Sequence, residues 1–153
     1  MESKHKVFSP EELIPVLLEV LETTELVPLV ISGSSMNPFL VHGRDIVYLS
    51  KIYCPLKRGD MVLYRRNNGQ YVIHRIYRCH LQTFTMVGDA QTSLEAGIRP
   101  EQILARVCMV RRKDRLLKPG CFWWEFFQRI WIRLIPLRPG IFAIYSKISH
   151  LFR

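Results

Sequence analysis

The chain lacks the long apolar run that a membrane-spanning helix needs. No stretch of about 18 residues is apolar and free of charge, which is the length expected of a spanning helix. The first ten residues, 1–10, are polar and of mixed charge, with no apolar stretch and no small-residue cleavage site. They do not resemble a secretory signal peptide. We therefore expect a cytoplasmic protein, either free or held at the inner face of a membrane.

Cysteine is scarce and widely spaced. The four cysteines form no C-x-x-C pair, and only five histidines are available as further ligands. A zinc site or a secreted disulfide framework needs close ligand or cysteine spacing. We therefore expect reduced thiols, no bound metal and no cofactor. The cysteines are Cys54, Cys79, Cys108 and Cys121.

Acidic residues are rare at one end of the chain only. Residues 1–110 hold 12 Lys and Arg against 11 Asp and Glu, whereas residues 111–153 hold 10 against 2. The sequence pI of about 9.7 would suit a nucleic-acid-binding protein if the charge were spread over the whole chain. Because the imbalance is confined to the tail, nucleic acid is not the expected partner.

The 153 residues, 48% of them hydrophobic, suffice for one domain with a real core. Ser9-Pro10-Glu11-Glu12 is typical of a helix start with a capping box, and apolar residues on one helical face follow it. Between residues 27 and 111, short runs rich in Val, Ile, Tyr and Phe alternate with turn residues, which predicts strands. The predicted strands are 27–32, 45–50, 60–66, 71–78, 82–87 and 103–111.

Asn68-Gly69 between two of these strands indicates a β-hairpin. The predicted fold is thus mainly β: an antiparallel β unit over 27–113, an N-terminal helical segment over 1–26, and a basic, aromatic-rich tail over 114–153. In the tail, residues 121–135 have a wide apolar face and a narrow polar stripe. Pro136 and Pro139-Gly140 end that helix, and a second apolar segment, 141–152, follows.

Three interpretations of the tail remain open at this point. It packs on the β unit as core, lies in a membrane interface, or forms a dimer through its apolar face. Trp is favoured at membrane interfaces, and the flanking Arg residues can extend toward headgroups. These features favour peripheral membrane contact.

One loop could carry chemistry. Ser32-Gly33-Ser34-Ser35-Met36-Asn37-Pro38 follows a predicted strand, and Gly33 allows a sharp turn. A serine nucleophile needs such a turn and backbone N–H groups directed at the developing oxyanion. Taken alone, the stretch is an ordinary Ser/Gly loop. It gains meaning from His74, within a predicted strand, because histidine is suited to accept a hydroxyl proton near neutral pH.

The order of four motifs resembles a known family. S-G-x-S-M-x-P at the loop is followed by G-D-x-V at Gly59, V-x-H-R-I at Val72 and G-D at Gly88. This series, over roughly residues 30–110, resembles signal peptidase I, in the branch that uses a Ser/His pair. Self-cleaving phage-type repressors share that peptidase fold.

The resemblance implies roles for particular residues. Ser35 matches the nucleophile, His74 the general base and Asp89 the acid that supports the histidine. Ser34 and Met36 flank the nucleophile at the expected substrate and oxyanion position. The family usually has Asn where this chain has Ala90, and Glu95 is an alternative acid, so the third catalytic member is left open between Asp89 and Glu95. Asp45 and Asp60 match framework positions that stabilise turns.

The function that these residues imply is a serine endopeptidase that cuts a leader or signal-like segment from a peptide or protein substrate. Two alternatives are a self-cleaving regulatory protein and a non-catalytic binding module of the same fold. The first is disfavoured because the 26 residues before the β unit are too few for a helix-turn-helix domain. The second is disfavoured by the presence of both Ser35 and His74.

Overall fold

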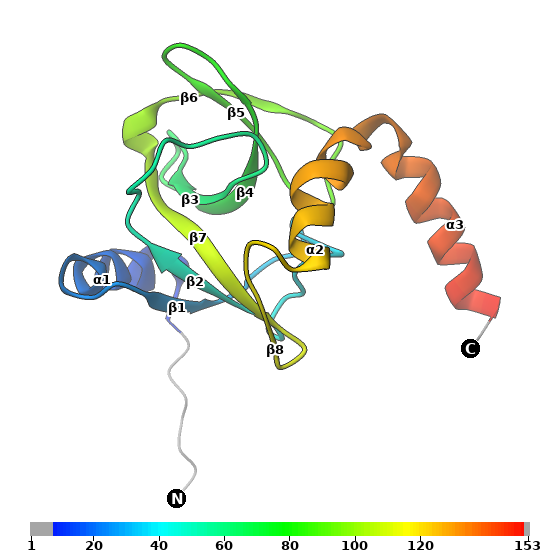
Figure 1. Ribbon diagram of the computed structural model, residues 1–153, viewed down its shortest axis with the longest axis horizontal. Coiled ribbons are helices and arrows are strands. Elements are labelled where there is room, and N and C mark those ends of the chain that lie inside the picture. Colours follow the sequence, from blue (N-terminus) through cyan, green and yellow to red (C-terminus); the bar gives the residue numbers. More distant parts are fainter. Residues whose placement is uncertain (1–7, 152–153) are drawn as a thin grey trace, which may run out of the picture.

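The computed structural model describes residues 8–151 and contains one eight-stranded antiparallel sheet with helices at both ends of the chain (Figure 1). The mainly β fold with flanking helices is therefore confirmed. The expectation for residues 1–7, like the last two residues of the predicted tail, lies outside the described residues. The strands are β1 (Val27–Val30), β2 (Ile46–Ser50), β3 (Met61–Arg65), β4 (Tyr71–Cys79), β5 (Phe84–Val87), β6 (Glu95–Ile98), β7 (Ile103–Arg112) and β8 (Arg115–Leu117).

Helix α1 (Pro10–Thr23) begins where the sequence predicts. The Ser9 side chain accepts from the Glu12 backbone N–H, and the Glu12 carboxylate accepts from the Ser9 N–H, so the capping box is formed. Pro10 occupies the first turn, where backbone N–H groups have no acceptor within the helix, so the N–H that proline lacks costs no hydrogen bond. Ile14 and Leu21 are buried against the sheet, so α1 covers one part of its surface.

The sheet runs in the order β1-β2-β7-β3-β4-β5-β6, and β8 forms a hairpin with β7. The predicted Asn68-Gly69 hairpin joins β3 to β4, and Gly69 adopts a φ of 89°. The sheet is strongly curled (Figure 1). Strand β1 pairs only with β2, so its other edge is free.

Strands β6 and β8 and the short 3₁₀ turn η1 (Pro100–Gln102) were absent from the sequence prediction. β6 reads Glu-Ala-Gly-Ile and β8 reads Arg-Leu-Leu. Neither has the β-branched or aromatic enrichment that marks a strand in sequence. Both are formed because a neighbouring strand offers backbone partners.

The C-terminal segment divides into a packed part and a projecting part. Helix α2 (Phe122–Glu125) continues through a π turn, η2 (Phe126–Ile130), and two 3₁₀ turns, η3 (Trp131–Arg133) and η4 (Ile135–Leu137). Four side chains of this stretch are buried, so it contributes to the core as far as Ile132. They are Trp124, Phe127, Trp131 and Ile132.

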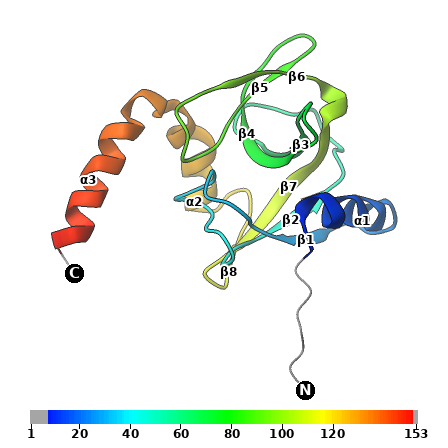
Figure 2. The same ribbon diagram turned by 180° about the vertical axis from the view of Figure 1, so that it is seen from behind.

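Helix α3 (Arg138–Leu151) leads away from the body (Figure 2). Pro139 and Gly140 lie in its first turn, where proline is tolerated, so they start a helix as well as separating it from the preceding one. Residues 143–151 are all exposed. Within residues 8–151, no helix combines the length and apolar content needed to cross a bilayer.

Candidate active site

The predicted nucleophile loop leaves the free-edged strand β1. Gly33 adopts a φ of 83°, in the left-handed region that favours glycine. Its N–H donates to His42 Nδ1 at 2.9 Å, and the Asn37 N–H donates to the Ser34 carbonyl at 3.1 Å. These contacts form a compact turn in which Ser35 is half-buried. The predicted sharp turn at Ser35 is therefore present.

The residues after Ser35 fix the loop to the core. Met36, Phe39 and Leu40 are buried in the main hydrophobic cluster. The Phe39 ring lies 4.8 Å from that of Phe127, centroid to centroid. The Met36 side chain is thus committed to packing, and a role of Met36 toward substrate would have to come from its backbone.

His74 lies on β4, directly opposite Val62 of β3. Only 1% of its surface is exposed, yet it borders the same groove as Ser35. Gly88 shows how closely the two approach: a Cβ built there would lie 2.5 Å from the Ser35 carbonyl oxygen and 3.1 Å from His74 Nε2. The Ser35 backbone carbonyl and the imidazole Nε2 therefore both lie beside Gly88, at a position where a larger residue would collide with the loop.

The other nitrogen of His74 is held by a chain of three polar side chains. Nδ1 lies 3.0 Å from the Tyr64 hydroxyl, and that hydroxyl donates to Glu95 Oε2 at 2.7 Å. Arg66 donates to both Glu95 oxygens, at 2.9 and 2.8 Å. Tyr64 is fully buried. Both ends of the series His74–Tyr64–Glu95–Arg66 border the groove, since His74 and Arg66 line it and Tyr64 does not.

The charges in this hydrogen-bonded series determine which nitrogen of His74 carries the proton. Burial would raise the pKa of Glu95, but hydrogen bonds from Arg66 and Tyr64 outweigh it and lower that pKa. An ionised carboxylate only accepts, so the Tyr64 hydroxyl must donate to Glu95 and accept from His74 Nδ1–H. The lone pair therefore resides on Nε2, the nitrogen beside Gly88.

Burial is also the main reason why the pKa of His74 is lowered to about 4, with a further contribution from the positive charge of Arg66 and opposition from Glu95. Burial likewise raises the pKa of the Tyr64 hydroxyl, together with its hydrogen bond to Glu95. At neutral pH both groups are uncharged. His74 is then a free base with its acceptor nitrogen near Ser35. Within residues 8–151, no hydrogen bond joins Ser35 Oγ to the ring; in the absence of substrate such contacts are often long.

The predicted support of His74 by Asp89 is not formed. Asp89 is fully buried, and both of its carboxylate oxygens accept from Arg75 Nε, at 2.9 and 3.1 Å. Consecutive strand residues point to opposite faces, so the Arg75 side chain points away from the His74 side. Asp89 pairs with Arg75 and therefore does not reach His74. Full burial raises the pKa of Asp89, and the attraction of Arg75 opposes that rise.

A second arginine fixes the turn that carries Gly88. Arg138, with no exposed surface, donates from Nη1 to the carbonyls of Gly88 and Gln91, at 2.8 and 2.6 Å. Its Nη2 donates to the Trp131 carbonyl at 3.0 Å. The Ala90 N–H in turn donates to the Ser35 carbonyl at 2.9 Å. The first residue of α3 therefore braces the contact between the turn and the predicted nucleophile loop.

The groove beside Ser35 and His74 has a volume of about 870 Å³. The free edge of β1 borders it on one side and Tyr71–His74 of β4 on the other, and β4 pairs with β5 only from Arg75 onward. Ser34 is exposed in this groove. Within residues 8–151, the backbone N–H groups of Ser34, Ser35 and Met36 have no acceptor. They are available to a ligand oxygen.

The framework acids hold turns, as predicted. Asp45 accepts from the Val41 and Lys113 N–H groups, at 2.8 and 3.3 Å, and Asp60 accepts from the Lys57 N–H at 2.9 Å. In the described part of the chain, no group of three or more His, Cys, Asp or Glu side chains is arranged to hold a metal ion.

Comparison with protein-family models, with curated proteins and with solved structures found no match to this chain. The resemblance to signal peptidase I thus rests on the motifs of the sequence, and the case for a function rests on the geometry around Ser35.

Sequence reasoning missed Tyr64, Arg66 and Arg138 and left Glu95 as an alternative. The alternation of β3 offered a signal for Tyr64. Val62 of β3 lies opposite His74, and Tyr64, two residues further along the same strand, points to the same face as Val62 and His74. No sequence signal pointed to Arg138, which lies 50 residues beyond the Gly88 carbonyl that it binds.

Proposed function

We propose that this protein is a serine endopeptidase that cuts a leader or signal-like segment from a peptide or protein substrate, with Ser35 as nucleophile and His74 as general base. The observation that carries the proposal is that Ser35 and His74 line one groove, with the Ser35 carbonyl and His74 Nε2 both beside Gly88. The groove between two free strand edges supports it, because an extended peptide can pair with such edges.

In the proposed reaction, His74 Nε2 takes the proton from Ser35 Oγ as the oxygen attacks the substrate carbonyl carbon. The unpartnered N–H groups at Ser34 to Met36 would stabilise the oxyanion. His74 then gives its proton to the leaving amine, and a water molecule hydrolyses the acyl-enzyme with His74 again as base. Tyr64 and Glu95 take the place that an acid holds in a Ser-His-Asp triad: they fix the tautomer and stabilise the charged imidazole.

The proposed location is the cytoplasm, at the inner face of a membrane. The four cysteines are all free, which supports a reducing compartment.

Labelling with a fluorophosphonate, which reacts with activated serines, tests the proposal. Intact-mass and peptide mapping should find wild-type protein modified at Ser35, and the modification should be lost in Ser35→Ala and His74→Ala. Ser34→Ala is the matched control, since it removes the neighbouring hydroxyl and should still label. Incubation with a mixture of unstructured peptides, read by mass spectrometry, accompanies the labelling.

The alternative is a binding module that uses the same strand edges without cutting. The missing hydrogen bond between Ser35 Oγ and His74 is the observation that favours it. Folded wild-type protein that neither reacts with the probe nor cuts any peptide would establish this alternative and refute the peptidase.

A further inference from the structure

The exposed part of α3 carries an apolar stripe. Ile141, Ile144, Tyr145, Ile148 and Leu151 recur at spacings of three and four, which places them on one side of the helix. All five are at least one third exposed, from 36% for Ile141 to 80% for Leu151. The other side carries Ser146, Lys147, Ser149 and His150. An isolated helix of this length is marginal in water, so its apolar side calls for a cover.

The body supplies cover only at the start of α3. Phe142 packs edge-to-face on Trp131, with ring centroids 5.9 Å apart, and Arg138 is buried at the Gly88 turn. From residue 143 to 151 every side chain is exposed. The buried attachment at one end and the exposed remainder make α3 an arm that presents its stripe to the outside of the domain.

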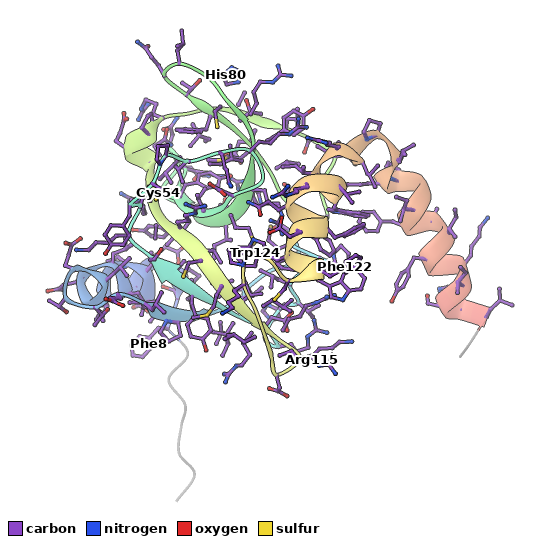
Figure 3. The ribbon with its side chains drawn as sticks, viewed as in Figure 1. Phe8, Cys54, His80, Arg115, Phe122 and Trp124 are labelled. Carbon is purple, nitrogen blue, oxygen red and sulfur yellow. The ribbon has the colours of Figure 1, made fainter. Side chains whose placement is uncertain are left out.

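Further exposed aromatic and basic groups lie near the same end of the molecule. Phe122 and Trp123 of α2 are 72% and 47% exposed, and Phe122 lies on the side of α2 that faces α3 (Figure 3). The tip of the β7–β8 hairpin and the free end of α3 both extend toward the lower end of Figures 1 and 2. That hairpin exposes Arg111, Lys113 and Arg115, and Lys118 follows it.

We propose that α3, together with the basic β7–β8 hairpin, docks this protein on an anionic lipid surface. Apolar side chains with Trp and Tyr among them suit the boundary between headgroups and acyl chains. The exposed basic side chains of the hairpin region complement anionic headgroups, and residues 111–153 as a whole hold 10 basic against 2 acidic side chains. The same charge disfavours a second copy of the chain as the cover, since two such surfaces repel.

Flotation of the full chain with vesicles tests this docking without any reference to peptidase activity. One vesicle preparation is phosphatidylcholine alone, and the other is an equal mixture of phosphatidylcholine and phosphatidylglycerol. We expect flotation with the anionic vesicles and much less with the neutral ones, and a loss of binding at high salt. The double variant Ile144→Ser/Ile148→Ser should bind about tenfold more weakly or worse, because it removes apolar surface from the stripe.

Two further variants separate the contribution of the α3 stripe from that of other exposed apolar side chains and from that of the basic side chains. Leu81→Ser/Ile52→Ser removes two exposed apolar side chains outside the C-terminal segment and should float as wild type. Arg115→Gln/Lys118→Gln should weaken binding to the anionic vesicles only. Failure of wild type to float with anionic vesicles, or equal flotation of the Ile144/Ile148 variant, would overturn the proposal. A concentration-dependent dimer in sedimentation velocity, lost in that variant while vesicles stay unbound, would assign the stripe to a second copy instead.

Discussion

The hydrogen-bonded series from His74 through Tyr64 to Glu95 leads to a quantitative prediction for the substitution Tyr64→Phe. The substitution removes one oxygen and leaves the ring in a fully buried site, so packing should be preserved. His74 Nδ1–H then loses its acceptor in a place that water does not reach. Leaving a buried donor unpaired costs about 1–3 kcal/mol, and the imidazole can relieve it by moving its proton to Nε2, the nitrogen that must accept from Ser35.

At about 1.4 kcal/mol per tenfold change in rate, this loss corresponds to a fall in reactivity of roughly 5- to 150-fold. The assay is the rate of fluorophosphonate labelling at Ser35, measured over a range of probe concentrations. The maximal rate should fall while the half-saturating concentration stays constant, because Tyr64 does not line the groove. Glu95→Gln should fall less, since an amide oxygen can still accept from the Tyr64 hydroxyl.

Tyr77→Phe is the matched control. Tyr77 lies on the same strand as His74, and its hydroxyl makes no hydrogen bond within residues 8–151. ¹⁵N NMR of the imidazole gives a readout independent of the reaction: Nδ1 protonated in wild type, and a mixture of tautomers in Tyr64→Phe. A folded Tyr64→Phe protein that labels at the wild-type rate, with its tautomer unchanged, would refute the role assigned to Tyr64.

Three more predictions follow from the same geometry. Because only neutral His74 can accept a proton, and its pKa is lowered to about 4, the labelling rate should be independent of pH above about 5 and fall tenfold per pH unit below about 4. The unfolded chain takes up this proton at the ordinary histidine pKa near 6.5, so the free energy of unfolding should drop by up to about 3 kcal/mol as the pH falls from about 6.5 to 4. Urea titrations of His74→Gln should lack this drop. Gly88→Ala should abolish labelling, since its Cβ would lie 2.5 Å from the Ser35 carbonyl, whereas Gly140→Ala, which meets nothing within 4 Å, should label normally. Asp89→Asn should destabilise the fold by about 3–5 kcal/mol in denaturant titrations because it leaves the charge of Arg75 buried without its partner; unchanged stability together with lost labelling would return Asp89 to a catalytic role.

Much of the fold is readable in the sequence because local signals agree with the tertiary structure. The capping box at Ser9, the Asn68-Gly69 turn and the six Val- and Ile-rich strands all lie where their patterns predict. β6 escaped prediction because its pairing with β5 is supplied by tertiary context. The tail could not be assigned from its composition, since the same wide apolar face suits a core, a membrane and a dimer; residues 124–132 turn out to contribute core side chains.

Ser35 and His74 could be identified from motif order, but their supporting residues could not. The sequence does not say which face of β4 turns toward Asp89, and a one-residue alternation decides it. His74 lies on one face and Arg75 on the other. Asp89 therefore pairs with Arg75, and the imidazole is hydrogen-bonded to the Tyr64 hydroxyl instead. A sequence motif that keeps an acid after the histidine strand therefore does not by itself identify the partner of the histidine.

The two supports of the site have different natures and should fail differently. The Tyr64–Glu95–Arg66 series acts on one proton of the imidazole, so its loss should change chemistry more than stability. The Asp89–Arg75 pair and Arg138 act on the backbone between Gly88 and Gln91, which positions Ser35, so their loss should change both. Because Arg138 is also the first residue of α3, the segment that projects from the domain is joined directly to the turn behind Ser35. Shortening the chain before Trp124 would remove buried core side chains as well as the arm, so studies of the arm require substitutions on its exposed side in the full chain.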